Sequence, residues 1–122
     1  GNPDAPLHFE QGAFKDCAAL RSLTVRANGR WLEPGLFIGS DAFKDCAALA
    51  TVTVYGNVSE VRKDAFCRSP VQHLVFPEGL RHLWWELVEA CAATLEDISA
   101  PAADLEREAA QLEKYAVKRI AL

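Results

Sequence analysis

Among the side chains that could do acid–base chemistry, His73 and Asp97 have a spacing that could place them on neighbouring strands. A histidine held by an aspartate forms part of a catalytic triad, which also needs a nucleophile beside the histidine. The repeat described below places no serine or cysteine there, and Cys67 falls on another part of it. We therefore predict a polar surface pair, no catalytic residues and no enzyme.

Four cysteines are present: Cys17, Cys46, Cys67 and Cys91. They form no Cys-x-x-Cys pair, and neither His8 nor His82 has partners at the spacing of metal ligands. The sequence also lacks a glycine-rich phosphate loop, so it predicts no metal and no cofactor. Small buried thiols are the simplest interpretation of the cysteines, and a disulfide framework is the alternative.

The composition bounds the class of protein. The chain has 122 residues, a quarter of them charged and half apolar, which suits one soluble globular domain. Its net charge of -4 argues against a nucleic-acid platform, which usually needs a basic face. Charges interrupt every apolar run, so we expect no membrane insertion. The sequence contains no signal peptide, and the localisation stays open.

An internal repeat must position these side chains. The stretch Ala13 to Val25 recurs almost verbatim as Ala42 to Val54. Weaker copies follow at a period of about 23 residues, which is typical of leucine-rich repeats. In each copy two apolar residues lie two positions apart, as they do on one side of a strand. We expect five inward-facing residues to align across successive coils: Leu23, Val52, Leu74, Ile98 and Ile120.

Further elements follow from the same alignment. A second extended piece is predicted at residues 36–38, 58–61 and 80–83, each before an Ala-Phe segment or its counterpart. In the two best copies we predict one helical turn between this Phe and the next strand, at residues 15–19 and 44–48. The last unit has lost the motif, and its apolar stripe predicts a longer helix over residues 102–116 that covers the end of the core.

The pattern Ala-Phe-x-x-Cys-x-x-Leu-x-x-Leu-x-Val at residues 13–25 and 42–54 resembles the BspA-type leucine-rich repeat, also called the Treponema pallidum type. The segments 38–43, 58–66 and 71–77 resemble other parts of that repeat. The resemblance implies an α/β solenoid: a curved, right-handed superhelix of about five coils. Short parallel strands would lie on one face, short helical turns on the other, and a longer helix at the C-terminal end.

The resemblance also bears on function and domain organisation. It implies a non-catalytic protein-interaction module, adhesive and associated with the cell surface in many bacterial members, and it transfers no catalytic residues. We expect a single domain over residues 1–122. Residues 1–8 would be a frayed N-terminus, 9–77 the regular repeats, and 78–122 degenerate repeats with a C-terminal cap.

Two sets of side chains are candidates for binding a protein or a surface glycan. The first is the expected concave strand face: Arg26, Thr53, Tyr55, His73, Asp97 and Arg119. The second is a set of aromatics expected at the surface: Trp31, Trp84 and Trp85. The alternatives are a solvated face without a partner, and tryptophans that pack inward. A structural spacer that self-associates end to end or as a dimer is a further alternative.

Overall fold

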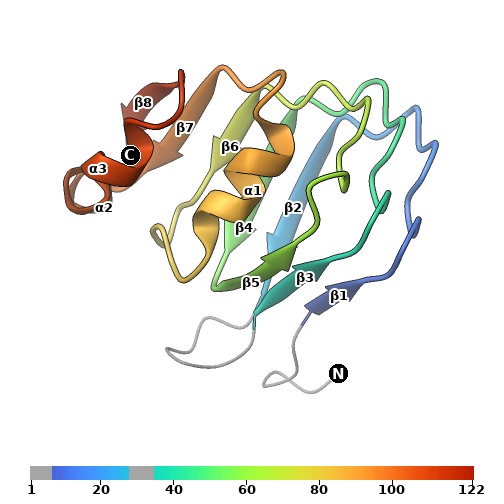
Figure 1. Cartoon of the computed structure of the whole chain (residues 1–122), viewed down its shortest axis with the longest axis horizontal. Coiled ribbons are helices and arrows are strands. Elements are labelled where there is room, and N and C mark those ends of the chain that lie inside the picture. The colour runs from blue at the N-terminus through green and yellow to red at the C-terminus, as the bar shows by residue number, and fades with distance from the viewer. Residues whose placement is uncertain (1–6, 28–34) are drawn as a thin grey trace.

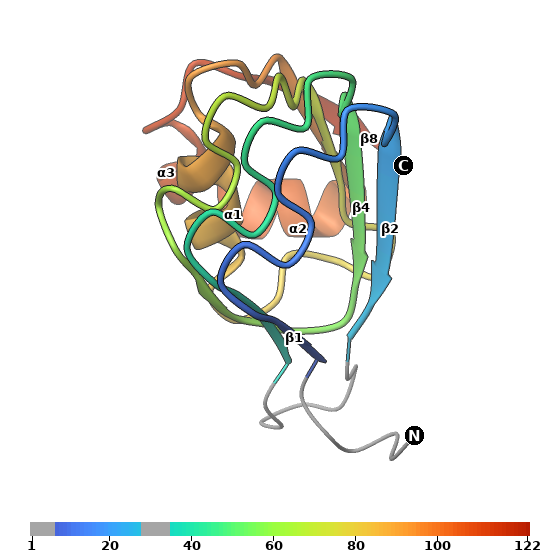
Figure 2. The same ribbon diagram turned by 90° about the vertical axis from the view of Figure 1, so that its right-hand side faces the viewer.

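The computed structural model describes residues 7–27 and 35–122. Within them the strands form two sheets, and neighbouring strands of each sheet run parallel (Figure 1). The three-stranded sheet has the order β1 (Leu7–Phe9), β3 (Leu36–Ile38), β5 (Val58–Val61). The five-stranded sheet has the order β2 (Ser22–Arg26), β4 (Thr51–Tyr55), β6 (His73–Val75), β7 (Asp97–Ala100), β8 (Lys118–Ala121). Viewed along the stack, successive coils overlie one another, so each coil rests on its neighbours (Figure 2).

The alternation of apolar and polar residues sets the register of the larger sheet. Leu23 lies opposite Val52, Val52 opposite Leu74, and Leu74 opposite Ile98. The last three of these side chains are fully buried. Alternate side chains of a strand point to opposite sides, so the same register turns the intervening polar residues outward. The predicted inward alignment is confirmed for these four residues.

The last strand departs from the prediction by one residue. Arg119, and not Ile120, lies opposite Ile98, while Ile120 lies opposite Ser99 and is 37% exposed. A shift of one residue moves every side chain of a strand to the other side of the sheet. The prediction was therefore wrong for both residues, because the apolar period alone does not fix the length of the connection that precedes β8.

The repeated phenylalanines form a column inside the coils. The ring of Phe43 stacks on Phe14 at 5.3 Å and on Phe66 at 5.2 Å, with nearly parallel planes. Phe9 packs its edge against Phe14 and Phe43. Phe43 is fully buried, whereas Phe14, in the first coil, is 41% exposed. The column joins adjacent coils through the phenylalanine of each Ala-Phe segment.

The segments that follow these phenylalanines are hydrogen-bonded turns and not the predicted helical turns. Three residues at one repeat position, Asp16, Asp45 and Arg68, have φ values of 64°, 58° and 58°. This left-handed conformation cannot continue a right-handed helix, although aspartate adopts it more readily than most residues. The turns therefore end after a few residues.

The fourth unit contains a helix where the earlier units have turns. Helix α1 (Trp84–Cys91) lies on the side of the molecule opposite the five-stranded sheet (Figures 1 and 2). It buries Trp84, Leu87, Val88 and Cys91. These residues follow the i, i+3, i+4, i+7 spacing of one helical face. The predicted extended piece at residues 80–83 is reduced to an isolated β-bridge between Val58 and His82. The helix begins directly after it, at Trp84.

The elements at both ends of the chain have other bounds than predicted. Two short helices, α2 (Ala102–Arg107) and α3 (Ala109–Leu112), replace the continuous helix expected over residues 102–116. Glu108 separates them with φ −99° and ψ 15°, outside the α-helical region. At the other end, the expected frayed segment 1–8 extends too far, because Leu7 begins β1. The rest of that segment lies outside the described residues.

Candidate functional site

The outer side of the five-stranded sheet presents two rows of side chains that cross all of its strands. By register, the first row is Ser22, Thr51, His73, Asp97 and Lys118. The second row is Thr24, Thr53, Val75, Ser99 and Ile120. Neither sheet is curled or closed, so this face lacks the concavity implied by the resemblance. We call it the outer strand face.

His73 and Asp97 are neighbours on the outer strand face, as the spacing predicts. Nδ1 of His73 lies 2.8 Å from Oδ2 of Asp97 across β6 and β7. Their side chains are 39% and 16% exposed. Thr51 lies opposite His73 on the other side, but no hydrogen bond between Thr51 and His73 is found in the described part of the chain. The contact with Asp97 fixes the orientation of the imidazole.

A second ordered pair occupies the end of the same face. The guanidinium carbon of Arg26 lies 4.1 Å from the ring centroid of Tyr55, across β2 and β4. This cation–π geometry is worth about 0.5–1 kcal/mol at an exposed site. Thr53 lies between this pair and the His73–Asp97 pair, in the second row. Five of the six predicted residues of the strand face are therefore brought onto one surface.

Three other predicted site residues are placed differently. Arg119 occupies the inward register position of β8, opposite Ile98, and does not join the outer rows. Trp84 is fully buried, so its predicted exposure was wrong, and Trp85 is half-buried against the core with its ring at right angles to that of Trp84. The third tryptophan, Trp31, lies outside the described residues.

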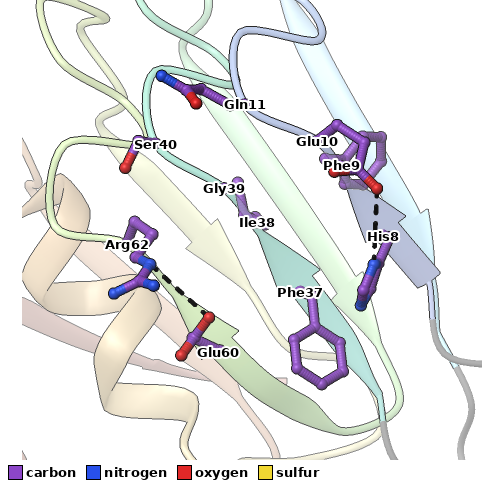
Figure 3. A pocket seen from close by; sticks show the side chains of 10 residues that line it. All are labelled: His8, Phe9, Glu10, Gln11, Phe37, Ile38, Gly39, Ser40, Glu60 and Arg62. Atoms are coloured by element: carbon purple, nitrogen blue, oxygen red, sulfur yellow. Dashed lines mark ion pairs between the residues drawn. The ribbon is translucent and has the colours of Figure 1, made fainter.

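The outer side of the three-stranded sheet carries a pocket of about 290 Å³ (Figure 3). Its first row is His8, Phe37 and Glu60, which lie opposite one another on β1, β3 and β5. The three residues that follow the paired Phe9, Ile38 and Val61 form a second row: Glu10, Gly39 and Arg62. Gly39 leaves a gap in the middle of the pocket. We call this hollow the Gly39 pocket.

The walls of the Gly39 pocket carry charges of both signs. Glu10 lies 3.8 Å from Nδ1 of His8 on one wall, and Glu60 lies 3.7 Å from Nε of Arg62 on the other (Figure 3). The ring of Phe37 makes an edge contact with that of His8, with centroids 4.5 Å apart. Sequence reasoning missed this site, although Gly39 follows a predicted strand and charged residues follow the strands at the equivalent positions.

A second hollow, of about 670 Å³, lies between the turn after Phe66 and helix α1, and Cys67 and Cys91 both line it. All four cysteines have free thiols, so the alternative of a disulfide framework is not seen. Burial raises the pKa of Cys91 and of Cys46 above the ordinary thiol value. Because the thiolate is the reactive form, neither is an activated nucleophile at neutral pH.

Two other kinds of site were sought in residues 7–27 and 35–122. No group of three or more His, Cys, Asp or Glu side chains is placed to hold a metal ion. No helix of this part of the chain is long and apolar enough to cross a bilayer.

The comparisons with known proteins bear on the repeat. No curated protein and no solved structure gives a significant match to the chain. A family model described as the BspA type leucine rich repeat region matches residues 8–102, in six copies. The matched segment covers well over half of the chain and contains the Phe column and the first four strands of the larger sheet. The chain therefore belongs to the BspA-type leucine-rich repeat family.

Proposed function

We propose that this chain is a non-catalytic interaction module that binds a partner protein through the outer strand face. The observation that carries the proposal is the pair of rows, mostly polar, that runs across all five strands. Arg26 is ordered on Tyr55 and His73 on Asp97 before any partner arrives, which lowers the entropy cost of association. Tyr and Arg are also enriched among the residues that dominate binding energy.

The proposal includes the finer features that the resemblance implies. The stacked strands support about five coils, and a right-handed winding is expected because parallel strands are almost always connected with that hand. An adhesive role at a cell surface would require the partner to be a surface or matrix protein. Identification of the captured partner tests that part separately from the binding face.

A capture experiment with two matched double variants tests the binding face. Tyr55→Ala/His73→Ala removes an aromatic residue and a histidine from the outer strand face. Phe37→Ala/His8→Ala removes the same two kinds of side chain from the other sheet. We expect the first variant to recover a wild-type partner at least about tenfold less well, a loss of about 1.4 kcal/mol, and the second to recover it normally. Equal recovery by the first variant would refute the proposal.

A structural role through self-association is the second candidate, and the exposed strand β8 favours it. All four of its residues are exposed, and Ile120 points to the outer side of the sheet. An exposed strand edge can pair with another chain. Sedimentation at several concentrations should then show a mass that rises with concentration and falls back in Ile120→Lys. A strict monomer at high concentration would exclude this candidate.

A further inference from the structure

The Gly39 pocket has the shape and chemistry of a saccharide site, and we propose that it binds an uncharged sugar ring, such as the terminal pyranose of a glycan. The site lies on the three-stranded sheet and is separate from the outer strand face. It therefore stands independently of the proposed protein-binding function.

Gly39 lines the hollow and has no side chain of its own to project into it. A Cβ atom placed there would lie 3.0 Å from the backbone nitrogen of Gln11 and 3.1 Å from the carbonyl oxygen of Phe9. A larger residue would crowd this backbone, so glycine allows the two coils to approach each other closely at this position. The volume of about 290 Å³ lies at the lower end of the range for small-molecule pockets, so it suits one ring and not an extended peptide.

The polar groups around the hollow suit a ligand rich in hydroxyl groups. The carboxylates of Glu10 and Glu60 can accept hydrogen bonds, while Gln11, Ser40 and Arg62 add donors. The ion pairs within each wall measure 3.8 Å and 3.7 Å, longer than a hydrogen bond of about 2.9 Å. They therefore leave the carboxylate oxygens able to accept from a ligand. A hydroxyl group both donates and accepts, so it can satisfy either wall.

The ring of Phe37 and the balance of charges around the pocket indicate what else the ligand needs: an apolar face and no negative charge. Phe37 lies between the two walls, half-buried, and its ring is supported by the edge contact with His8. An aromatic ring can pack against the C–H face of a pyranose while the walls bind its hydroxyl groups. Two carboxylates face one guanidinium, which disfavours an acidic sugar. A neutral ring is therefore the ligand that the pocket fits best.

A titration followed by amide NMR tests the site directly. We would add the methyl glycosides of glucose, galactose, mannose and N-acetylglucosamine to the ¹⁵N-labelled chain. At least one should shift the Gln11, Gly39 and Arg62 amides saturably, with a Kd of about 1–10 mM, because the pocket is open and shallow. The absence of saturable shifts for all four sugars up to about 50 mM would overturn the proposal. So would binding of phenylalanine, a zwitterionic ligand, at these amides without any sugar.

Conservative variants identify the groups that bind. Glu60→Gln keeps the shape of the side chain but removes a charged acceptor. Because hydrogen bonds to charged groups are stronger than those to neutral groups, we expect the variant to bind the sugar at least about fivefold more weakly. Phe37→Leu keeps apolar volume without the ring and should also weaken it about fivefold. Glu113→Gln, an exposed residue near the C-terminal end, is the matched control. Unchanged affinity in both pocket variants, each with a native-like spectrum, would overturn the assignment.

Discussion

Single residues maintain the contacts between coils even where the repeat sequence changes. The thiol of Cys46 donates to the carbonyl oxygen of Phe14 in the preceding coil at 3.2 Å. At the same position in the next coil, the hydroxyl of Ser69 donates to the carbonyl oxygen of Phe43 and accepts from the backbone N–H of Cys46 at 2.9 Å. Both side chains are buried. The motif therefore requires a small hydrogen-bond donor there, and not cysteine itself.

Substitution of Ser69 tests this requirement. Ser69→Ala leaves a buried carbonyl and a buried N–H without their partner, which should lower the free energy of unfolding by about 1–3 kcal/mol. Ser69→Cys restores the residue found in the two best copies and should lose clearly less. Chemical denaturation of both variants measures the difference. Equal losses for alanine and cysteine would mean that a thiol cannot replace the hydroxyl here, which would contradict the requirement for any small donor.

The adjacent repeat position carries an ion pair that makes a pH-dependent contribution. Arg68 binds Asp45 of the preceding coil through two hydrogen bonds, of 2.6 Å and 2.8 Å, and holds the pKa of that carboxyl below its usual value. A lowered folded-state pKa means that the contribution is complete above the ordinary value of about 3.9 and is lost as the pH falls through the folded pKa. Arg68 is largely exposed, so the effect on overall stability is small.

Titration of the Asp45 carboxyl by NMR tests this coupling. In Arg68→Gln the pKa of Asp45 should rise toward its ordinary value, because its largest stabilising partner is gone. Lys63→Gln removes a charge that contributes no resolved part of the shift and should leave the pKa as in the wild type. An unchanged pKa in Arg68→Gln would show that the ion pair does not persist in solution.

At the scale of elements, the strands of the regular repeats could be predicted, but the helix that replaces a turn in the fourth unit could not. Strands β2, β4 and β6 follow from alternating apolar residues, because each such residue is needed in the shared interior. Helix α1 was not predicted, because the repeat alignment assigned an extended piece to residues 80–83 and surface positions to Trp84 and Trp85. The helical spacing from Trp84 to Cys91 was present in the sequence, and a local period should have outweighed the repeat alignment.

The attachment of α2 to the fourth coil depends on one carboxylate. Oδ2 of Asp104 accepts from the backbone N–H of Leu80 and from Nη2 of Arg107, both at 2.8 Å. Leu80 is buried, so Asp104→Ala should lower the free energy of unfolding by about 1–3 kcal/mol. Glu106→Ala, at an exposed position of the same helix, should change it by less than about 0.5 kcal/mol. Thermal denaturation of the two variants measures the difference. Equal losses of stability would contradict the role of the Asp104 carboxylate.

At the scale of the whole molecule, the sequence placed most of the predicted strand-face residues on one surface but did not predict the Gly39 pocket. The outer strand face follows from the strand period, and only Arg119 was misplaced, because the register of β8 depends on the path after α3. The Gly39 pocket combines residues from three coils that are far apart in the chain. Its recognition requires the pairing of β1, β3 and β5, which no single repeat specifies.

The stacking of coils also predicts how stability is distributed along the solenoid. Strands β2 and β4 have five residues each, but β2 has one neighbouring strand while β4 lies between β2 and β6. Leu23 is only half-buried, whereas the equivalent Val52 is fully buried. Because each coil is stabilised by its neighbours, the edge coil should open first. Amide hydrogen exchange followed by mass spectrometry should therefore be at least about tenfold slower, or about 1.4 kcal/mol more protected, in β4 than in β2. Equal exchange in the two strands would mean that the coils open only as one cooperative unit.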